Sequence, residues 1–158
     1  MTVRTNFLTF GLSAAILFAP MMASAEEYRV CPAEQTAIGI ETVKEACGDI
    51  IKPDFEVEGQ TTLSDLRSMK EKRDAFRQEV TDYGNCVTAF INSYRRPGAD
   101  ATSTKPDEAA CAHSWAQDQV TETIREFGRT CFAFNDAALV KGEQGFAGNC
   151  YPTFGEAG

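Results

Sequence analysis

The sequence predicts an all-α fold: an antiparallel hairpin of two long helices, with a short helix before it, an irregular tail after it, and three disulfides that staple these parts together. Three observations lead to this prediction. One stretch carries a heptad seam of nine positions that are apolar except for Arg73, a second stripe with helical spacing follows after a short loop, and six cysteines follow an export signal.

The first 25 residues read as a secretory signal. Arg4 is followed by an apolar run from Phe7 to Pro20 and by the small residues Ala23-Ser24-Ala25, so we expect cleavage before Glu26. The apolar run, about a dozen residues, is too short to span a membrane, which takes roughly 20. Residues 26–158 should therefore form a single exported domain, periplasmic or secreted.

The exported part is small and acidic. Removing 25 of the 158 residues leaves 133, with 14 basic and 23 acidic side chains and a net charge of −9. No basic run is longer than Arg95-Arg96, which argues against nucleic-acid binding and against adhesion to anionic lipid. After signal cleavage we expect no membrane span and no nucleic-acid partner.

The segment before the hairpin should be partly helical. Residues 33–46 can form a helix in which Gly39 is a weak point, and Gly48 and Pro53 supply stops after it. In residues 50–59 apolar and charged side chains alternate, so we expect a short extended strap that lies across the hairpin.

The first long helix should run from Thr62 to Tyr94. Thr62-Leu63-Ser64-Asp65 fits a capping box, and Pro97-Gly98 ends the helical pattern. The seam of this helix consists of Leu66, Met69, Arg73, Phe76, Val80, Tyr83, Val87, Phe90 and Tyr94. Only this stripe of the helix is apolar enough to be buried, so we expect it to pack against a partner helix.

That partner should begin near Asp107, where Thr104 offers a second cap. Its apolar stripe consists of Ala112, Ala116, Val120, Ile124, Phe127, Cys131, Phe134 and Ala138. A loop of about nine residues makes the two helices antiparallel, with facing positions whose numbers add up to about 200. Gly128 could bend or break this helix, and after Val140 a glycine-rich tail should be anchored by Cys150.

An even number of cysteines in an exported chain indicates a disulfide framework. The hairpin register favours Cys86 with Cys111 near its open end, and we expect any other partner of Cys86 to contradict the register. Cys131 then pairs with Cys150, and Cys31 with Cys47. In the alternative, Cys31 and Cys47 cross to Cys131 and Cys150. No C-x-x-C motif occurs, so a structural role is expected for all six.

No catalytic, cofactor or metal residues can be nominated. His113 is the only histidine, and with Cys111 it cannot complete a coordination shell or a nucleophile–base pair. Phosphate-binding glycine loops are missing, and the carboxylates fall beside lysine and arginine on helix flanks. We expect a protein that is not an enzyme and has no cofactor, while an enzyme that uses a carboxylate pair stays a minor alternative.

The two predicted long helices contain more aromatic residues than the packing of one helix seam requires. Trp115, Phe132, Phe90 and Tyr94 are candidates for an apolar contact surface. We therefore expect an exported interaction or accessory module, inhibitory or chaperone-like, whose partner is another periplasmic or envelope protein. The alternative is a carrier that holds a small apolar ligand in a groove between the helices.

Overall fold

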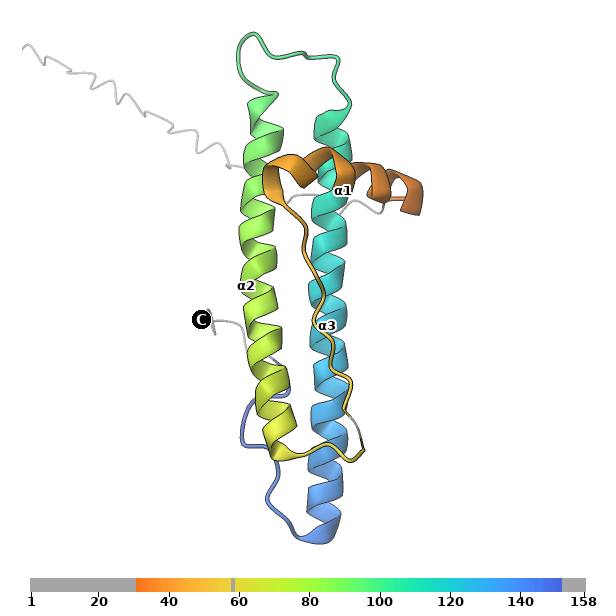
Figure 1. Ribbon diagram of the computed structural model, residues 1–158, viewed down its shortest axis with the longest axis vertical. Coiled ribbons are helices and arrows are strands. Elements are labelled where there is room, and N and C mark those ends of the chain that lie inside the picture. The colour runs from red at the N-terminus through yellow and green to blue at the C-terminus, as the bar shows by residue number, and fades with distance from the viewer. Residues whose placement is uncertain (1–30, 58, 152–158) are drawn as a thin grey trace, which may run out of the picture.

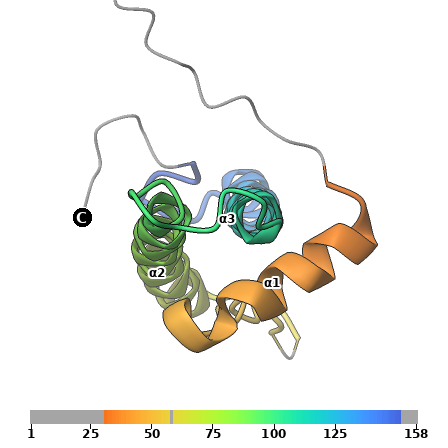
Figure 2. The same ribbon diagram turned by 90° about the horizontal axis from the view of Figure 1, so that it is seen from above.

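The computed structural model describes residues 31–57 and 59–151, and the predicted signal lies outside these residues. The described chain is all-helical, with α1 at Ala33–Cys47, α2 at Leu63–Ser93 and α3 at Lys105–Lys141. α2 and α3 lie side by side and antiparallel, and α1 crosses one face of the pair near the loop that joins them (Figure 1). Seen from above, α1 reaches from α2 to beyond α3 (Figure 2).

The predicted register of the hairpin is confirmed by contacts between the two long helices. The guanidinium of Arg73 on α2 lies 4.5 Å from the ring centroid of Phe127 on α3. Nearer the loop, Gly84 approaches the imidazole of His113. Both pairs have residue numbers that add up to about 200, as a loop centred near residue 100 requires.

The capping box at the start of α2 is also confirmed. The Thr62 hydroxyl accepts a hydrogen bond from the Asp65 amide, and the Asp65 carboxylate accepts one from the Thr62 amide at 2.8 Å. Thr104 behaves differently from the prediction, because its hydroxyl donates to the Glu108 carboxylate and caps no backbone amide. α3 also continues unbroken through Gly128, so the break considered there does not occur.

Two of the three predicted disulfides are wrong. Cys86 bonds to Cys47, at the end of α1, and Cys111 bonds to Cys31, just before α1. Cys86 and Cys111 each precede a seam residue by one position, so each is turned about 100° from the helix contact toward the face that α1 crosses. Helix axes lie roughly 8–10 Å apart, too far for a direct bond between residues turned this way.

The new pairing leaves the hairpin intact, so the expectation that it would contradict the register was also wrong. Each cysteine bonds to the crossing segment and not to the opposite long helix. Cys47–Cys86 fixes the end of α1 to α2, and Cys31–Cys111 fixes the chain two residues before α1 to α3. α1 is thus fastened near both of its ends.

Glycine at position 39 lets α1 approach α3 closely. A Cβ atom at Gly39 would lie 2.2 Å from the carbonyl oxygen of Glu108 and 3.1 Å from the amide nitrogen of Ala112. Beside this contact the Thr42 hydroxyl donates to the Glu108 carboxylate at 2.8 Å. The residue that weakens α1 as an isolated helix is therefore the one that allows the crossing.

The strap after α1 lies on the hairpin, as predicted, but it runs lengthwise along the long helices and does not cross them (Figure 1). Phe55 is buried with its ring 6.4 Å from that of Phe127. Lys52 forms an ion pair with Glu126 of α3 at 3.0 Å, and Lys72 of α2 donates to the Asp54 carbonyl at 3.3 Å. Side chains from both long helices thus hold the strap.

Two apolar clusters make up the core. The cluster near the loop joins the three helices through Val43, Ile50, Phe76, Val80, Tyr83, Val87, Ala109, Ala112 and Ala116. The cluster at the opposite end joins the strap, both long helices and the tail through Phe55, Leu66, Met69, Phe127, Cys131 and Cys150. The second cluster brings the C-terminal tail against α3.

Candidate interaction surface

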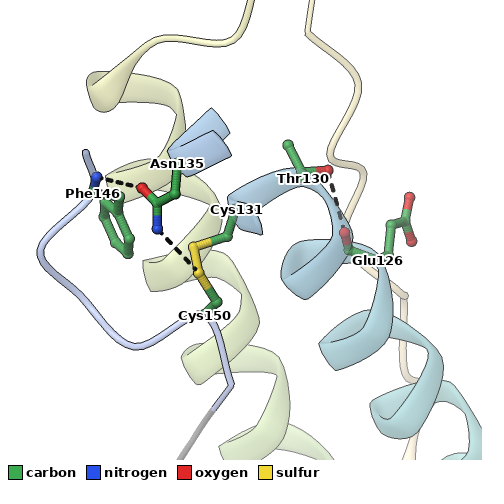
Figure 3. The surroundings of a disulfide bond; sticks show 6 residues. All are labelled: Glu126, Thr130, Cys131, Asn135, Phe146 and Cys150. Atoms are coloured by element: carbon green, nitrogen blue, oxygen red, sulfur yellow. Dashed lines mark hydrogen bonds between the residues drawn. A yellow bond between two sulfur atoms is a disulfide. The ribbon is translucent and has the colours of Figure 1, made fainter. Parts of the chain in front are cut away.

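The tail after α3 is folded back by one disulfide and one asparagine. Cys131 bonds to Cys150, as predicted. The Asn135 side chain accepts a hydrogen bond from the Phe146 amide at 2.7 Å and its amide nitrogen points to the Cys150 sulfur at 3.6 Å (Figure 3). Phe146 then reaches the far core cluster, where its ring centroid lies 6.2 Å from that of Phe127.

Tyr151 ends the described part of the tail and packs on the side of α3. A Cβ atom at Gly128 would lie 2.7 Å from the Tyr151 ring, so this glycine makes room for the tyrosine. The Tyr151 ring centroid lies 5.6 Å from that of Phe132. Tyr151 therefore supports one edge of Phe132, whose side chain remains 48% exposed.

The last turns of α3 expose large apolar side chains. Leu139 is 79% exposed and Val140 is 87% exposed. The helix ends at Lys141, and Gly142, in the left-handed conformation with φ 68°, caps it with an amide that donates back to the Leu139 carbonyl. α3 extends past the start of α2 at this end, as Figure 1 shows, so α2 does not cover these turns.

We call the exposed side of the C-terminal part of α3 the distal face. It consists of five exposed residues at heptad spacing and the exposed residue next to the last of them: Arg125, Arg129, Phe132, Asp136, Leu139 and Val140. The spacing was available in the sequence, but the prediction of α3 followed only the stripe that faces α2. Leu139 and Val140 were missed as surface residues for that reason.

Beside the distal face lies an open hollow of about 420 Å³. Its walls come from the segment before α2 and from α3: Gln60, Thr61, Arg129, Thr130, Ala133, Phe134 and Ala137. The hollow is thus not the predicted groove between the two long helices. It combines one aromatic ring and two alanines with polar groups and the Arg129 guanidinium.

The residues predicted as a contact surface are split between the two ends of the hairpin. Phe90 and Tyr94 lie together with ring centroids 5.4 Å apart, and Phe90 and Trp115 pack against the core cluster near the loop. Phe132 lies 17 positions beyond Trp115 on α3, or about 25 Å along the axis. Only Phe132 belongs to the distal face.

Two buried polar atoms of α2 have no hydrogen-bond partner among the described residues: Arg73 Nη1 and the Tyr83 hydroxyl. Arg73 donates one hydrogen bond from Nε and one from Nη2 to the Asp74 carboxylate, with Nη2 2.6 Å from the acceptor oxygen. Burial raises the pKa of Tyr83, and the charge of Asp49 raises it further. Neither atom opens into the hollow, so both belong to the core.

Ion pairs at the surface hold α1 and the strap. The hydrogen bond that Lys52 donates to the Glu126 carboxylate raises the pKa of Lys52, although burial opposes this. In the same way the hydrogen bond that Lys44 donates to the Asp49 carboxylate raises the pKa of Lys44, at the end of α1. These charged groups are therefore engaged in joining segments of the fold.

The described residues contain no group of three or more side chains that could hold a metal ion. Cys111, which the sequence places two residues before His113, is bonded to Cys31. All six cysteines are in disulfides, which fits a protein of an oxidising compartment. No helix in the described ranges is long and apolar enough to cross a membrane.

Comparison with known proteins gave no match. No protein-family model matches the chain, and neither does any curated protein or solved structure. Its function must therefore be inferred from its own residues.

Proposed function

We propose that the protein is an exported, non-enzymatic interaction module that binds a protein partner in its compartment through the distal face of α3. One observation carries the proposal: Leu139 and Val140 are exposed next to each other in the last turns of α3, which extend past the start of α2, and Phe132 is half-exposed two turns earlier on the same side. Neighbouring exposed apolar side chains mark protein contact sites more often than isolated ones do.

The remainder of the fold supports a contact surface at this place. Disulfides fasten α1 and the tail, and the strap is held by Phe55 and Lys52. The distal face is therefore presented by a stiff scaffold that loses little conformational freedom on binding. A rigid helix face with heptad spacing suits a partner that supplies a helix or groove.

The test is photo-crosslinking from two positions in the compartment where the protein is made. A photoreactive phenylalanine analogue replaces Leu139 in one variant and Ile51, which is 80% exposed on the strap, in a control variant. We expect covalent adducts with a defined protein from position 139 and few from position 51. Equal yields at both positions, or adducts at neither, would contradict the proposal.

A second candidate function is the carriage of a small apolar molecule in the hollow. Its volume of about 420 Å³ falls within the roughly 300–1,000 Å³ of small-molecule sites. Ala133→Trp would fill the hollow, and Ile51→Trp is the matched control. If the protein is a carrier, native mass spectrometry will show a ligand on the control and none on the filled variant. A protein recovered without ligand in both forms would exclude it.

A further inference from the structure

We infer that the chain which occupies the distal face is a second copy of this protein, with the two α3 helices packed antiparallel. This inference rests on the proposed contact surface and names its partner. Its starting point is the order of charged and apolar residues along the face. Arg129 and Asp136 lie on either side of Phe132, seven positions apart, and both are exposed.

Within one chain these two charges cannot meet. Seven residues span about 10 Å along a helix, well beyond ion-pair distance. The described residues include no ion pair of Arg129 or Asp136. Both charges are therefore available to a chain that approaches from outside.

A two-fold axis that runs between the two α3 helices, perpendicular to both, satisfies both charges at once. When this axis is level with the midpoint between Phe132 and Ala133, Arg129 of each copy faces Asp136 of the other, because every pair in an isologous contact occurs twice. In the same register Val140 lies opposite Arg125 of the second copy. The aliphatic part of that arginine side chain can cover Val140. Phe132 then lies at the centre of the contact, where aromatic anchors contribute most.

The charge of the segment also favours a second copy over a strongly charged partner. From Arg125 to Glu143 the chain carries three basic and three acidic side chains, although its overall formal charge is −8. The contact is thus neutral in a molecule whose remaining surface repels its own copies. Because this segment of α3 carries no net charge, it offers no electrostatic complement to a strongly acidic or a strongly basic partner.

The contact should be a weak one. Positions 125 to 140 span about 23 Å of helix, and one helix pair of this length falls below the area of standard interfaces. We therefore expect self-association that is visible at micromolar and higher concentrations. The protein purified from its own compartment, with its three disulfides intact, is suited to sedimentation analysis over such a range.

Charge reversal tests the register. Arg129→Glu alone places two like-charged pairs in the dimer, and so does Asp136→Arg alone. For each single variant we expect the dissociation constant to rise at least about tenfold. The double variant R129E/D136R restores both pairs with reversed sign and should return to within about threefold of the original value. Arg96→Glu, with the same charge change in the exposed loop, is the control.

Phe132→Asp is a second, independent variant. Its side chain is half-exposed, so the helix signal should persist while the dimer is lost. A dimer that survives both Phe132→Asp and Arg129→Glu would overturn the inference. Failure of the double variant to restore what each single reversal breaks would overturn the antiparallel register.

Two further outcomes separate this inference from the proposed function. A protein that stays monomeric at millimolar concentration, while position 139 still crosslinks a different protein, refutes the second copy and leaves the contact surface standing. A chain that dimerises only when residues 152–158 are removed would show that its own C-terminal segment covers the face, which also refutes the inference. If position 139 crosslinks nothing as well, both proposals fail.

Discussion

Replacing Gly39 with alanine sets two opposite effects against each other. In the middle of a helix, alanine is favoured over glycine by about 1 kcal/mol, so helix propensity alone predicts a more stable protein. The structure predicts the opposite sign. The added Cβ would lie 2.2 Å from the Glu108 carbonyl oxygen, whereas ordinary contacts of this kind lie at 3.4–4 Å.

The size of the loss follows from what has to move. The blocking atom belongs to the backbone of α3, so α1 must retreat by about 1 Å, and overpacking of this kind costs about 1–3 kcal/mol. Retreat also stretches the 2.8 Å hydrogen bond from Thr42 to Glu108, which costs about 1 kcal/mol more. After the propensity gain, we expect a net loss of about 1–3 kcal/mol, or a melting temperature lower by roughly 3–10 °C.

Urea unfolding followed by circular dichroism measures this difference. Ala37→Gly, at an exposed position of the same helix, is the control and should lose only the propensity term of about 1 kcal/mol. The cost at position 39 should shrink in the variant that lacks Cys47 and Cys86, because α1 is then free to move at one end. A Gly39→Ala protein stabilised by about 1 kcal/mol would refute the close crossing.

Three further predictions concern the core, the first turn of α2 and the tail. Arg73→Met should keep or raise stability in urea unfolding, because it removes a buried charge with an unpaired Nη1, whereas Arg73→Ala should lose about 2–5 kcal/mol to a cavity; equal losses would contradict this. Hydrogen bonds from Thr62 hold the pKa of Asp65 below 3.8, so Asp65→Ala should destabilise at pH 7, and a pH titration should show this difference vanishing as the pH falls through the lowered folded-state pKa. Replacing Cys131 and Cys150 with alanine opens a loop of separation 19 and should lower stability in urea unfolding by about 3 kcal/mol with little change in the helix signal. A large loss of helix there would show that the tail supports the hairpin itself.

The long helices, their register and the strap could be predicted from the sequence because local periodicity encodes them. A seam of apolar residues determines which side of α2 is buried, and a short loop determines the direction of α3. Thr62 and Asp65 mark a helix start by chemistry that needs no tertiary contact. Cys131 could be paired with Cys150 because no cysteine faces position 131 across the hairpin.

The position of α1 could not be predicted in the same way. The sequence of a short helix with one apolar edge does not indicate which face of the hairpin the helix packs on. The predicted pairing of Cys86 with Cys111 also assumed that only the two long helices could supply a partner for these cysteines. Gly39 was the available signal. A glycine in the middle of a helix that is not interrupted there indicates that another segment packs closely against the helix at that point. It was interpreted as a weak point of the helix alone.

The distal face shows a related limit. The apolar stripe of α3 identifies the side of the helix that packs against α2, and Leu139 and Val140 do not lie on that side. Whether α2 extends far enough to cover them depends on where each helix ends in space, which follows from the register and not from either sequence segment alone.

The Cys31–Cys111 bond joins the two halves of the hairpin independently of the loop between α2 and α3. A protease that cuts between Ser93 and Lys105, where Arg95 and Arg96 are exposed, would divide the described chain into one piece with α1 and α2 and another with α3. Both pieces would stay covalently attached, because Cys31 belongs to the first and Cys111 to the second. A cut molecule would therefore run as one band on a gel until it is reduced, and in a compartment rich in proteases it would keep both long helices within reach of each other.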